Sequence, residues 1–241
     1  MKQQKCQILF IQETHFVKEQ INKINQNCDA DCYHSFGNSN SRGVSILISK
    51  QVEYSIIDTH QDSEDIILIL NIELDNKNYT LVNIYVPNHV KERNSFFKKL
   101  KNMLEKTCLG MLIIGGDLND TLSFMDKKIV KNKVKSPVFG LKQLIKYFKL
   151  LDIWRIKHPN LKQFTWKRKH NNREASRIDF FLMQSEISPI ISSRDIRPAL
   201  IKYTDHLAIS IKLLSNSNDS GPRTFKLNNS ILENTDYQNL I

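Results

Sequence analysis

The 241-residue chain is 40% hydrophobic and 25% charged, a balance that is ordinary for a soluble globular protein with a substantial core. Lysine and arginine outnumber aspartate and glutamate by 35 to 25, and the net charge of +10 favours a polyanionic partner such as nucleic acid, although lysine-rich codon usage explains it equally well. Four cysteines without a CxxC pair exclude a disulfide scaffold, and no apolar run reaches the length of a membrane span, so we expect an intracellular protein with neither a membrane nor a disulfide-linked partner.

The first half of the chain is predicted to be rich in strands. The stretch CQILFI at 6–11 is typical of a short buried strand, a weak helical pattern covers 16–27, and further strands are predicted at 43–49 and 52–58. Residues 66–74 and 79–86 are predicted to form a hairpin around Asp75-Asn76-Lys77-Asn78.

The second half mixes helices and strands. Apolar residues at helical spacing predict helices over 92–106 and 141–148, and the apolar run 111–114, broken by Gly115-Gly116, is typical of a central buried strand. Further strands are predicted at 163–167, 177–183, 194–201 and 206–213. These elements favour an α+β fold in which two sheets pack face to face with helices outside. Residues 215–241 begin with the linker-like run SNSNDSGP and carry few apolar residues.

Polar side chains recur at the ends of these strands, where a layered fold presents side chains into a common cleft. They are Glu13, Asn83, Tyr85, Asp117, Asn119, Asp120, Asp179, Asp205 and His206. Cleaving a phosphodiester requires a hard cation, a base that activates water, and donors for the developing negative charge. Each of these residues alone has a plain structural alternative, such as a strand cap, but their joint occurrence in order favours a catalytic site.

The residue types suit this chemistry. Glu13 and Asp205 offer the oxygen ligands that Mg²⁺ prefers, and His206 can act as a base if Asp179 orients its other ring nitrogen. Tyr85 and Asn119 can donate hydrogen bonds to a phosphate oxygen.

Six ordered stretches resemble the endonuclease/exonuclease/phosphatase superfamily, which is related in fold to deoxyribonuclease I and the apurinic/apyrimidinic endonucleases. They are ILFIQETH (8–15), RGVSILI (42–48), VNIYVPN (82–88), IIGGDLND (113–120), SRIDFFL (176–182) and TDHLAI (204–209). LVNIYVPN, DIWRIKHP, QFTW and GPRTFKLNNSILEN are most similar to the endonuclease domain of non-LTR (LINE-type) retrotransposons. The resemblance implies a four-layered α/β sandwich of two mixed sheets flanked by helices.

The resemblance also implies roles for single residues. Glu13 would bind the cation, Mg²⁺ or alternatively Mn²⁺, with Asp205 at the same metal–water site. Tyr85 and Asn119 would contact the scissile phosphate, and Asp179 would orient His206. Asp117 would position or activate the water, so the base remains open between Asp117 and His206. The residues expected to bind substrate are Thr165, Ser176, Arg177, Asn83, Asn88 and His15.

Two basic regions have different interpretations. Lys167, Arg168, Lys169 and Arg173 lie in a predicted loop beside Phe164 and Trp166, and we favour contact with the DNA backbone over a solvated hairpin tip. The lysines between residues 127 and 135 are interpreted as solvated surface.

The expected organisation is a nuclease domain over 1–214 and a tail over 215–241 that leads toward a downstream reverse transcriptase of a parent polyprotein. The family normally carries a first strand with an asparagine, followed by a helix, before the QETH strand. Here both are missing, so we expect a truncated domain with an open sheet edge.

The predicted function is a metal-dependent DNA endonuclease, nuclear by resemblance, that nicks target DNA in retrotransposition. One alternative is apurinic/apyrimidinic repair or another phosphodiesterase activity of the same superfamily. The other is an inactive fragment that binds DNA through its charge alone.

Overall fold

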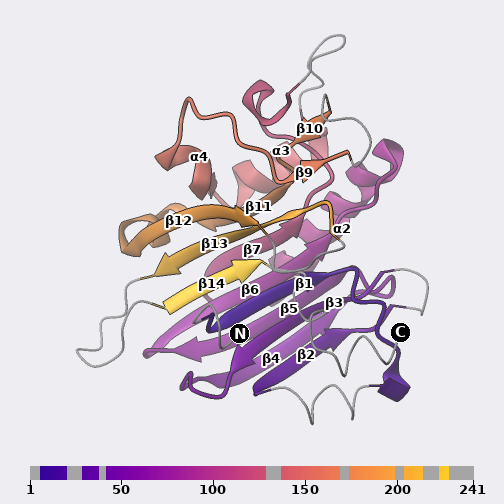
Figure 1. Ribbon diagram of the computed structural model, residues 1–241. Helices are drawn as coiled ribbons and strands as arrows, with labels where there is room; N and C mark the ends of the chain where they lie inside the picture. The colour runs from indigo at the N-terminus through magenta and orange to yellow at the C-terminus, as the bar shows by residue number, and fades with distance from the viewer. Residues whose placement is uncertain are drawn as a thin grey trace.

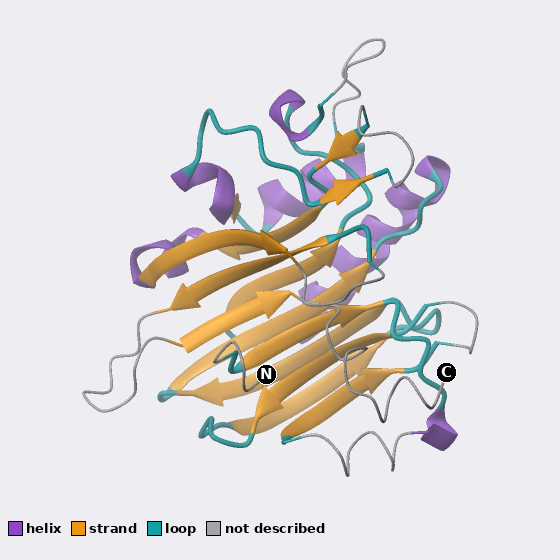
Figure 2. Ribbon diagram, in the orientation of Figure 1, coloured by secondary structure: helices purple, strands orange, loops and turns teal. Residues whose placement is uncertain are grey.

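Two six-stranded mixed sheets pack face to face in the computed structural model of the chain (Figures 1 and 2). The structure describes residues 6–20, 29–37, 42–128, 137–168, 174–198, 204–213 and 223–227. This arrangement confirms the predicted two-sheet sandwich with flanking helices.

The first sheet has the strand order β12-β13-β14-β1-β3-β2. Its strands are β1 (Ile8–Gln12), β2 (Ala30–Ser35), β3 (Val44–Ser49), β12 (Ile191–Pro198), β13 (Leu207–Leu213) and β14 (Arg223–Leu227). The sequence analysis missed β2, which lies at the edge of this sheet and mixes polar with apolar residues. The predicted helix at 16–27 falls largely outside the described residues, which here contain the 3-10 turn η2 (Lys18–Gln20).

The second sheet has the strand order β4-β5-β6-β7-β11-β8. Its strands are β4 (Ser55–Gln61), β5 (Ile67–Leu74), β6 (Lys77–Tyr85), β7 (Met111–Asp117), β8 (Leu150–Asp152) and β11 (Asp179–Gln184). The predicted hairpin is present, but its turn is only Asp75-Asn76, because both residues adopt positive φ (52° and 56°) as a two-residue turn requires. Two short strands, β9 (Trp166–Lys167) and β10 (Ala175–Ser176), pair separately.

The main core lies between the two sheets, and a second apolar layer lies under the helices. Phe10 of β1 meets Phe181 of β11 in the main core, with ring centroids 5.8 Å apart. The helices α2 (Val90–Thr107) and α3 (Phe139–Tyr147) cover the outer face of the second sheet through buried residues such as Leu100 and Leu144. The short elements η3 (Phe124–Asp126), α4 (Ile153–Lys157) and η4 (Ser185–Ile190) complete the fold. Among the described residues, no helix combines the length and apolar character that crossing a bilayer requires.

Strand β14 comes from the stretch that the sequence analysis assigned to a linker. It lies antiparallel to β13 and parallel to β1, with Phe225 opposite both Ile8 and Ile211. Figure 1 shows it between these two strands, in yellow. The edge of β1 that we expected to be open is therefore paired. A five-residue strand leaves little periodic signal, and its stability depends on two neighbours that are distant in sequence.

Replacing Lys226 by proline should destabilise the fold, because every backbone N–H of an interior strand has a partner on one side or the other. Lys226 lies opposite Leu9 and Ser210. We expect a loss of about 1–3 kcal/mol, which lowers the melting temperature by roughly 2–12 °C in calorimetry. Lys226→Ala, which keeps the N–H, is the control, and equal melting temperatures for the two variants would contradict the pairing.

Candidate active site

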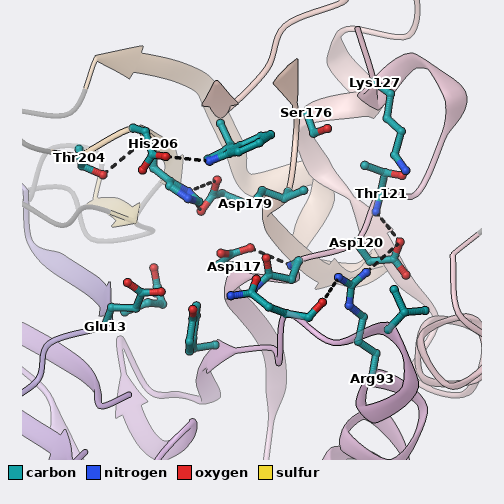
Figure 3. A pocket seen from close by; sticks show the side chains of 18 of the residues that line it. Glu13, Arg93, Asp117, Asp120, Thr121, Lys127, Ser176, Asp179, Thr204 and His206 are labelled. Carbon is teal, nitrogen blue, oxygen red and sulfur yellow. Dashed lines mark hydrogen bonds and ion pairs between the residues drawn. The ribbon is translucent and has the colours of Figure 1, made fainter. Parts of the chain in front are cut away.

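Strands of both sheets end at one pocket with a volume of about 960 Å³ (Figure 3). Glu13 follows β1, and His206 precedes β13, so both come from the first sheet. Tyr85 and Asp117 end the parallel strands β6 and β7, and Asp179 begins the antiparallel strand β11. Because β11 runs opposite to β7, its first residue lies beside the last residue of β7, and Asp179 faces Asp117. The topology thus brings together residues that are up to 193 positions apart.

Two glycines allow β7 to reach this position. A Cβ on Gly115 would lie 2.6 Å from the ring of Phe10, and one on Gly116 would lie 2.0 Å from the carbonyl oxygen of Ile84. Gly116 also has a φ of 145°, a backbone conformation that residues other than glycine rarely adopt. The Gly115-Gly116 pair therefore lets the strand pack closely against both neighbours and deliver Asp117 to the pocket.

Asp117, Asp179 and His206 form the centre of the pocket. The Nδ1 atom of His206 lies 3.1 Å and 3.0 Å from the two carboxylate oxygens of Asp179. One potential ligand atom from each of the three residues lies within 4.8 Å of the others. Asp117 and Asp179 are buried, with 6% and 5% of their surfaces exposed. The predicted pairing of Asp179 with His206 is therefore present in the geometry.

The charges of Asp117 and His206 shift each other's pKa. Burial raises the pKa of Asp117 to about 8, with a further contribution from the charge of Asp179 and an opposing one from His206. Burial acts to lower the pKa of His206, but the Asp179 carboxylate, together with Asp117 and Asp205, outweighs it and raises that pKa to about 10. Concentrated negative charge in a buried pocket favours a bound cation, which would relieve the repulsion between the carboxylates.

Glu13, Tyr85 and Asn119 surround the central cluster. Burial raises the pKa of Tyr85, and so does its hydrogen bond to Glu13. The backbone N–H of Asn119 donates to Asp117 Oδ1 at 2.8 Å, and its side-chain amide donates to the Val86 carbonyl at 2.7 Å. Glu13 and Asn119 both have positive φ (51° and 46°), a conformation that costs free energy and that is found at functional sites.

The donor set fits a hard divalent cation. The carboxylates of Glu13, Asp117, Asp179 and Asp205 all line the pocket, and among the described residues no cysteine does, so the ligands suit Mg²⁺ or Mn²⁺ better than a soft metal. Asp205 is held by Trp166, whose ring Nε1 donates to Asp205 Oδ2 at 2.9 Å. The sequence analysis placed Trp166 beside the basic loop, and the structure shows that it also contacts Asp205.

The structure places several predicted substrate-binding residues away from the pocket surface. Arg177 is only 1% exposed, because its guanidinium is enclosed by Asp126 and Asp152. Asn83 is fully buried and links the two sheets through hydrogen bonds to the Ile11 and Ser45 carbonyls.

Thr165 and His15 also differ from the expectation. The hydroxyl of Thr165 is buried, where it accepts hydrogen bonds from the N–H groups of Ile178 and Asp179 and so supports the start of β11. His15 is exposed outside the pocket lining. Ser176 and Asn88 do line the pocket, and their binding of substrate stays a prediction.

The basic residues that line the pocket are not the ones that the sequence analysis predicted to contact DNA. Lys167 and Arg168 are exposed outside the pocket, and Arg168 pairs with Glu174 at 2.7 Å. Lys169 and Arg173 lie outside the described residues. Lys127, which we interpreted as solvated surface, lines the pocket instead. Arg93, Asp120 and Thr121 line it as well, and no sequence motif distinguished Arg93 or Thr121 from ordinary surface residues.

Comparisons with known proteins agree with this geometry. The model of the Endonuclease/Exonuclease/phosphatase family matches residues 1–206. A Xenopus laevis protein, the transposon TX1 uncharacterized 149 kDa protein, is 28% identical over 232 residues, which cover 95% of this chain. The chain spans only 18% of the length of that relative.

Solved structures with the same fold include nucleases that are less than 25% identical. The 3′ phosphatase NExo from Neisseria, bound to a product DNA hairpin, has a TM-score of 0.72 at 19% identity and covers 86% of this chain and 88% of its own. The Xenopus laevis APE2 catalytic domain has a TM-score of 0.72 at 16% identity and covers 98% of this chain and 91% of its own. Because the family model matches well over half of the sequence, the chain belongs to the endonuclease/exonuclease/phosphatase family.

Proposed function

We propose that this chain is an endonuclease that cleaves DNA phosphodiesters with the help of a divalent cation. The observation that carries the proposal is the buried cluster of Asp117, Asp179 and His206 in a pocket that Glu13 and Asp205 also line. The net charge of +10 supports a polyanionic substrate despite this acidic centre. Membership of the family supports a hydrolytic reaction.

The central residues have complementary roles in this proposal. Asp179 contacts Nδ1 of His206 with both oxygens and thereby holds the ring, so that the other ring nitrogen is free to meet a phosphate oxygen. The carboxylates around His206 favour its protonated form, which donates a hydrogen bond rather than accepting a proton. We therefore propose Asp117 for the base role, which the sequence left open. Tyr85 and Asn119 would donate hydrogen bonds to the same phosphate.

Glu13 and Asp205 would hold the cation, which we propose to be Mg²⁺, with Mn²⁺ as a substitute. When bound, it supplies positive charge to the phosphate oxygens and makes water easier to deprotonate. Without substrate the Tyr85 hydroxyl donates to Glu13, and it would exchange this bond for the phosphate when Glu13 binds the cation.

Nicking of a supercoiled plasmid tests the proposal. We expect conversion to the open-circular form with Mg²⁺ and none with excess EDTA. Glu13→Gln keeps the shape but weakens the ligand, so the Mg²⁺ concentration for half-maximal rate should rise by at least about tenfold. Glu73→Gln, at an exposed position of β5, is the matched control. Equal Mg²⁺ dependence in both variants would remove Glu13 from the cation site.

The similarity to a transposon protein supports a narrower role, which is nicking of target DNA in retrotransposition within a longer, nuclear protein that carries a reverse transcriptase. That role requires a 3′-hydroxyl at the nick, which a polymerase can extend. We therefore expect a DNA polymerase to extend the nicked plasmid without prior phosphatase treatment. A product that requires dephosphorylation before extension would contradict this role.

The solved apurinic/apyrimidinic endonucleases of the same fold support a second candidate, which is cleavage at abasic sites. One such enzyme, from Archaeoglobus fulgidus, has a TM-score of 0.67 at 21% identity and covers 86% of this chain and 88% of its own. A duplex with one abasic site, compared with the intact duplex, separates the two candidates. Strong preference for the abasic duplex would favour repair, and equal rates would favour general nicking. DNA binding without cleavage of either duplex would favour an inactive copy.

A further inference from the structure

The pocket has two ends of opposite charge. Glu13, Asp117 and Asp179 lie at the proposed catalytic end, whereas Lys127 and Arg93 lie on the opposite wall. Figure 3 shows the Lys127 side chain extending along this wall toward Thr121, with Asp120 and Arg93 beyond it. A bound strand carries a negative phosphate at every nucleotide, so a pocket that binds it needs positive charge beyond the cleavage site.

Lys127 is unusual among the lysines of this surface. It is half-buried at the pocket wall, and among the described residues its ammonium group forms neither an ion pair nor a side-chain hydrogen bond. Arg93 is different, since its guanidinium donates to the carbonyls of Pro87 and Asn88 at 3.2 Å and 2.7 Å. The ammonium group of Lys127 is therefore available to an anion that enters the pocket.

Thr121 provides a second, independent observation. It is 98% buried and lines the same wall, yet its hydroxyl has no hydrogen-bond partner within the described part of the chain. Its backbone N–H is held by Asp120 Oδ1 at 2.8 Å, which fixes the residue in place. A buried hydroxyl without a partner costs free energy, and an oxygen-rich ligand at this wall would recover it.

The wall is held rigidly. Lys127 forms a β-bridge with Ser176, and the next N–H, that of Lys128, donates to the Ala175 carbonyl at 2.9 Å. Asp126, which precedes Lys127, and Arg177, which follows Ser176, form a buried ion pair at 2.8 Å next to this bridge. The backbone at Lys127 is thus fixed relative to Ser176, the last residue of β10, which lies three residues before Asp179. A fixed position lowers the entropy cost of binding.

We propose that Lys127, together with the hydroxyl of Thr121, forms a second phosphate subsite, which binds a backbone phosphate of the cleaved strand next to the scissile one. This inference rests on the proposed function. Lys127 provides the charge, and Thr121 provides a neutral donor. Arg93 contributes positive potential behind them, partly balanced by Asp120, whose carboxylate lies 4.0 Å from its guanidinium.

The first test compares two substrates. Lys127→Ala should raise the KM for an oligonucleotide about tenfold with little change in kcat, because a charge-assisted contact outside the reacting bond is lost. The same variant should leave the hydrolysis of bis(4-nitrophenyl) phosphate unchanged, because this diester has a single phosphate. The slope of log affinity against log salt concentration should also fall by about one.

Lys106→Ala is the matched control, since Lys106 lies in the last turn of α2, at the opposite end of the helix from the pocket residues Val90 and Arg93. Thr121→Val, which keeps the shape and removes the hydroxyl, should raise the KM for the oligonucleotide by roughly 2–10-fold. Equal effects of Lys127→Ala and Lys106→Ala on the KM for the oligonucleotide would overturn the subsite. So would an equal loss of activity of Lys127→Ala on the oligonucleotide and on bis(4-nitrophenyl) phosphate.

A second test locates the subsite on the strand. Oligonucleotides with one neutral methylphosphonate at each position flanking the cleaved bond are compared in the wild type and in Lys127→Ala. At one flanking position the methylphosphonate should raise the KM of the wild type about tenfold. It should leave the KM of Lys127→Ala unchanged, because that variant has already lost the contact. If the effects of the methylphosphonate and of Lys127→Ala on KM are additive at every position, the proposal is overturned. If the wild type cleaves no DNA, the proposed function fails. The same comparison of two proteins and two kinds of oligonucleotide, measured as binding affinity by fluorescence anisotropy, still shows whether the subsite exists.

Discussion

Asp179→Asn is expected to lower the kcat for DNA cleavage by about 10²–10⁴-fold with little change in KM. Both carboxylate oxygens of Asp179 contact Nδ1 of His206, at 3.0 Å and 3.1 Å. The amide keeps the shape of the side chain, but it removes the negative charge that orients the imidazole ring and stabilises its protonated form. It also offers an N–H to the ring in place of one oxygen. Single-turnover nicking of a plasmid measures the loss directly.

The chain provides a matched control for this experiment in a second Asp–His pair. Asp58 lies 2.8 Å from Nε2 of His60 on the exposed strand β4, outside the pocket. Asp58→Asn therefore makes the same chemical change in solvent and should leave kcat within about threefold of the wild type. Wild-type kcat in Asp179→Asn would exclude the proposed orienting role, as would the same decrease in both variants.

Arg177→Met is expected to destabilise the fold by about 3–5 kcal/mol and to lower the melting temperature by roughly 6–20 °C. The guanidinium bonds Asp126 Oδ1 at 2.9 Å and 2.8 Å, and it also bonds Asp152. It lies between the rings of Trp154 and Phe180, at 4.9 Å and 4.2 Å from their centroids. Methionine fills much of the volume but leaves the two carboxylates without their shared cation.

The control for this change is an arginine in a solvated pair. Arg168 pairs with Glu174 at 2.7 Å, and 60% of its side chain is exposed. Arg168→Met should change the free energy of unfolding by no more than about 1 kcal/mol, because water compensates for the lost pair. Calorimetry of both variants tests the contrast. Equal melting temperatures would show that the buried network contributes no more than a surface pair.

Much of the fold could be predicted because its core elements carry strong local patterns. The apolar run 111–114 and the helical spacing of Phe96, Leu100 and Leu104 predicted β7 and α2 to within a few residues. Strand β2 was missed because an edge strand is partly solvated and its sequence does not alternate clearly. Strand β14 was missed because it depends on β1 and β13 for its hydrogen bonds.

Several site residues could be predicted from their place at strand ends. Asp117, Asp179 and His206 meet because the strands that carry them end at one edge of the sandwich. Arg177, in contrast, stands beside Ser176 in the same motif and was predicted to bind substrate. Neighbouring side chains of an extended chain point to opposite sides, and Ser176, the last residue of β10, reaches the pocket while Arg177, which follows it, enters the interior.

The sequence by itself determined the family, the residue types of the buried Asp117, Asp179 and His206 cluster and the order of the main elements, because these depend on local patterns and on motifs that survive as short runs. Only the tertiary structure decided which polar residues face solvent, which are buried as partners of other charges, and which reach the pocket from distant segments. Lys127 is the clearest example, since its sequence neighbours suggest a solvated run. Its position opposite Ser176 depends on a bridge and an ion pair formed across about 50 residues, which no local pattern records.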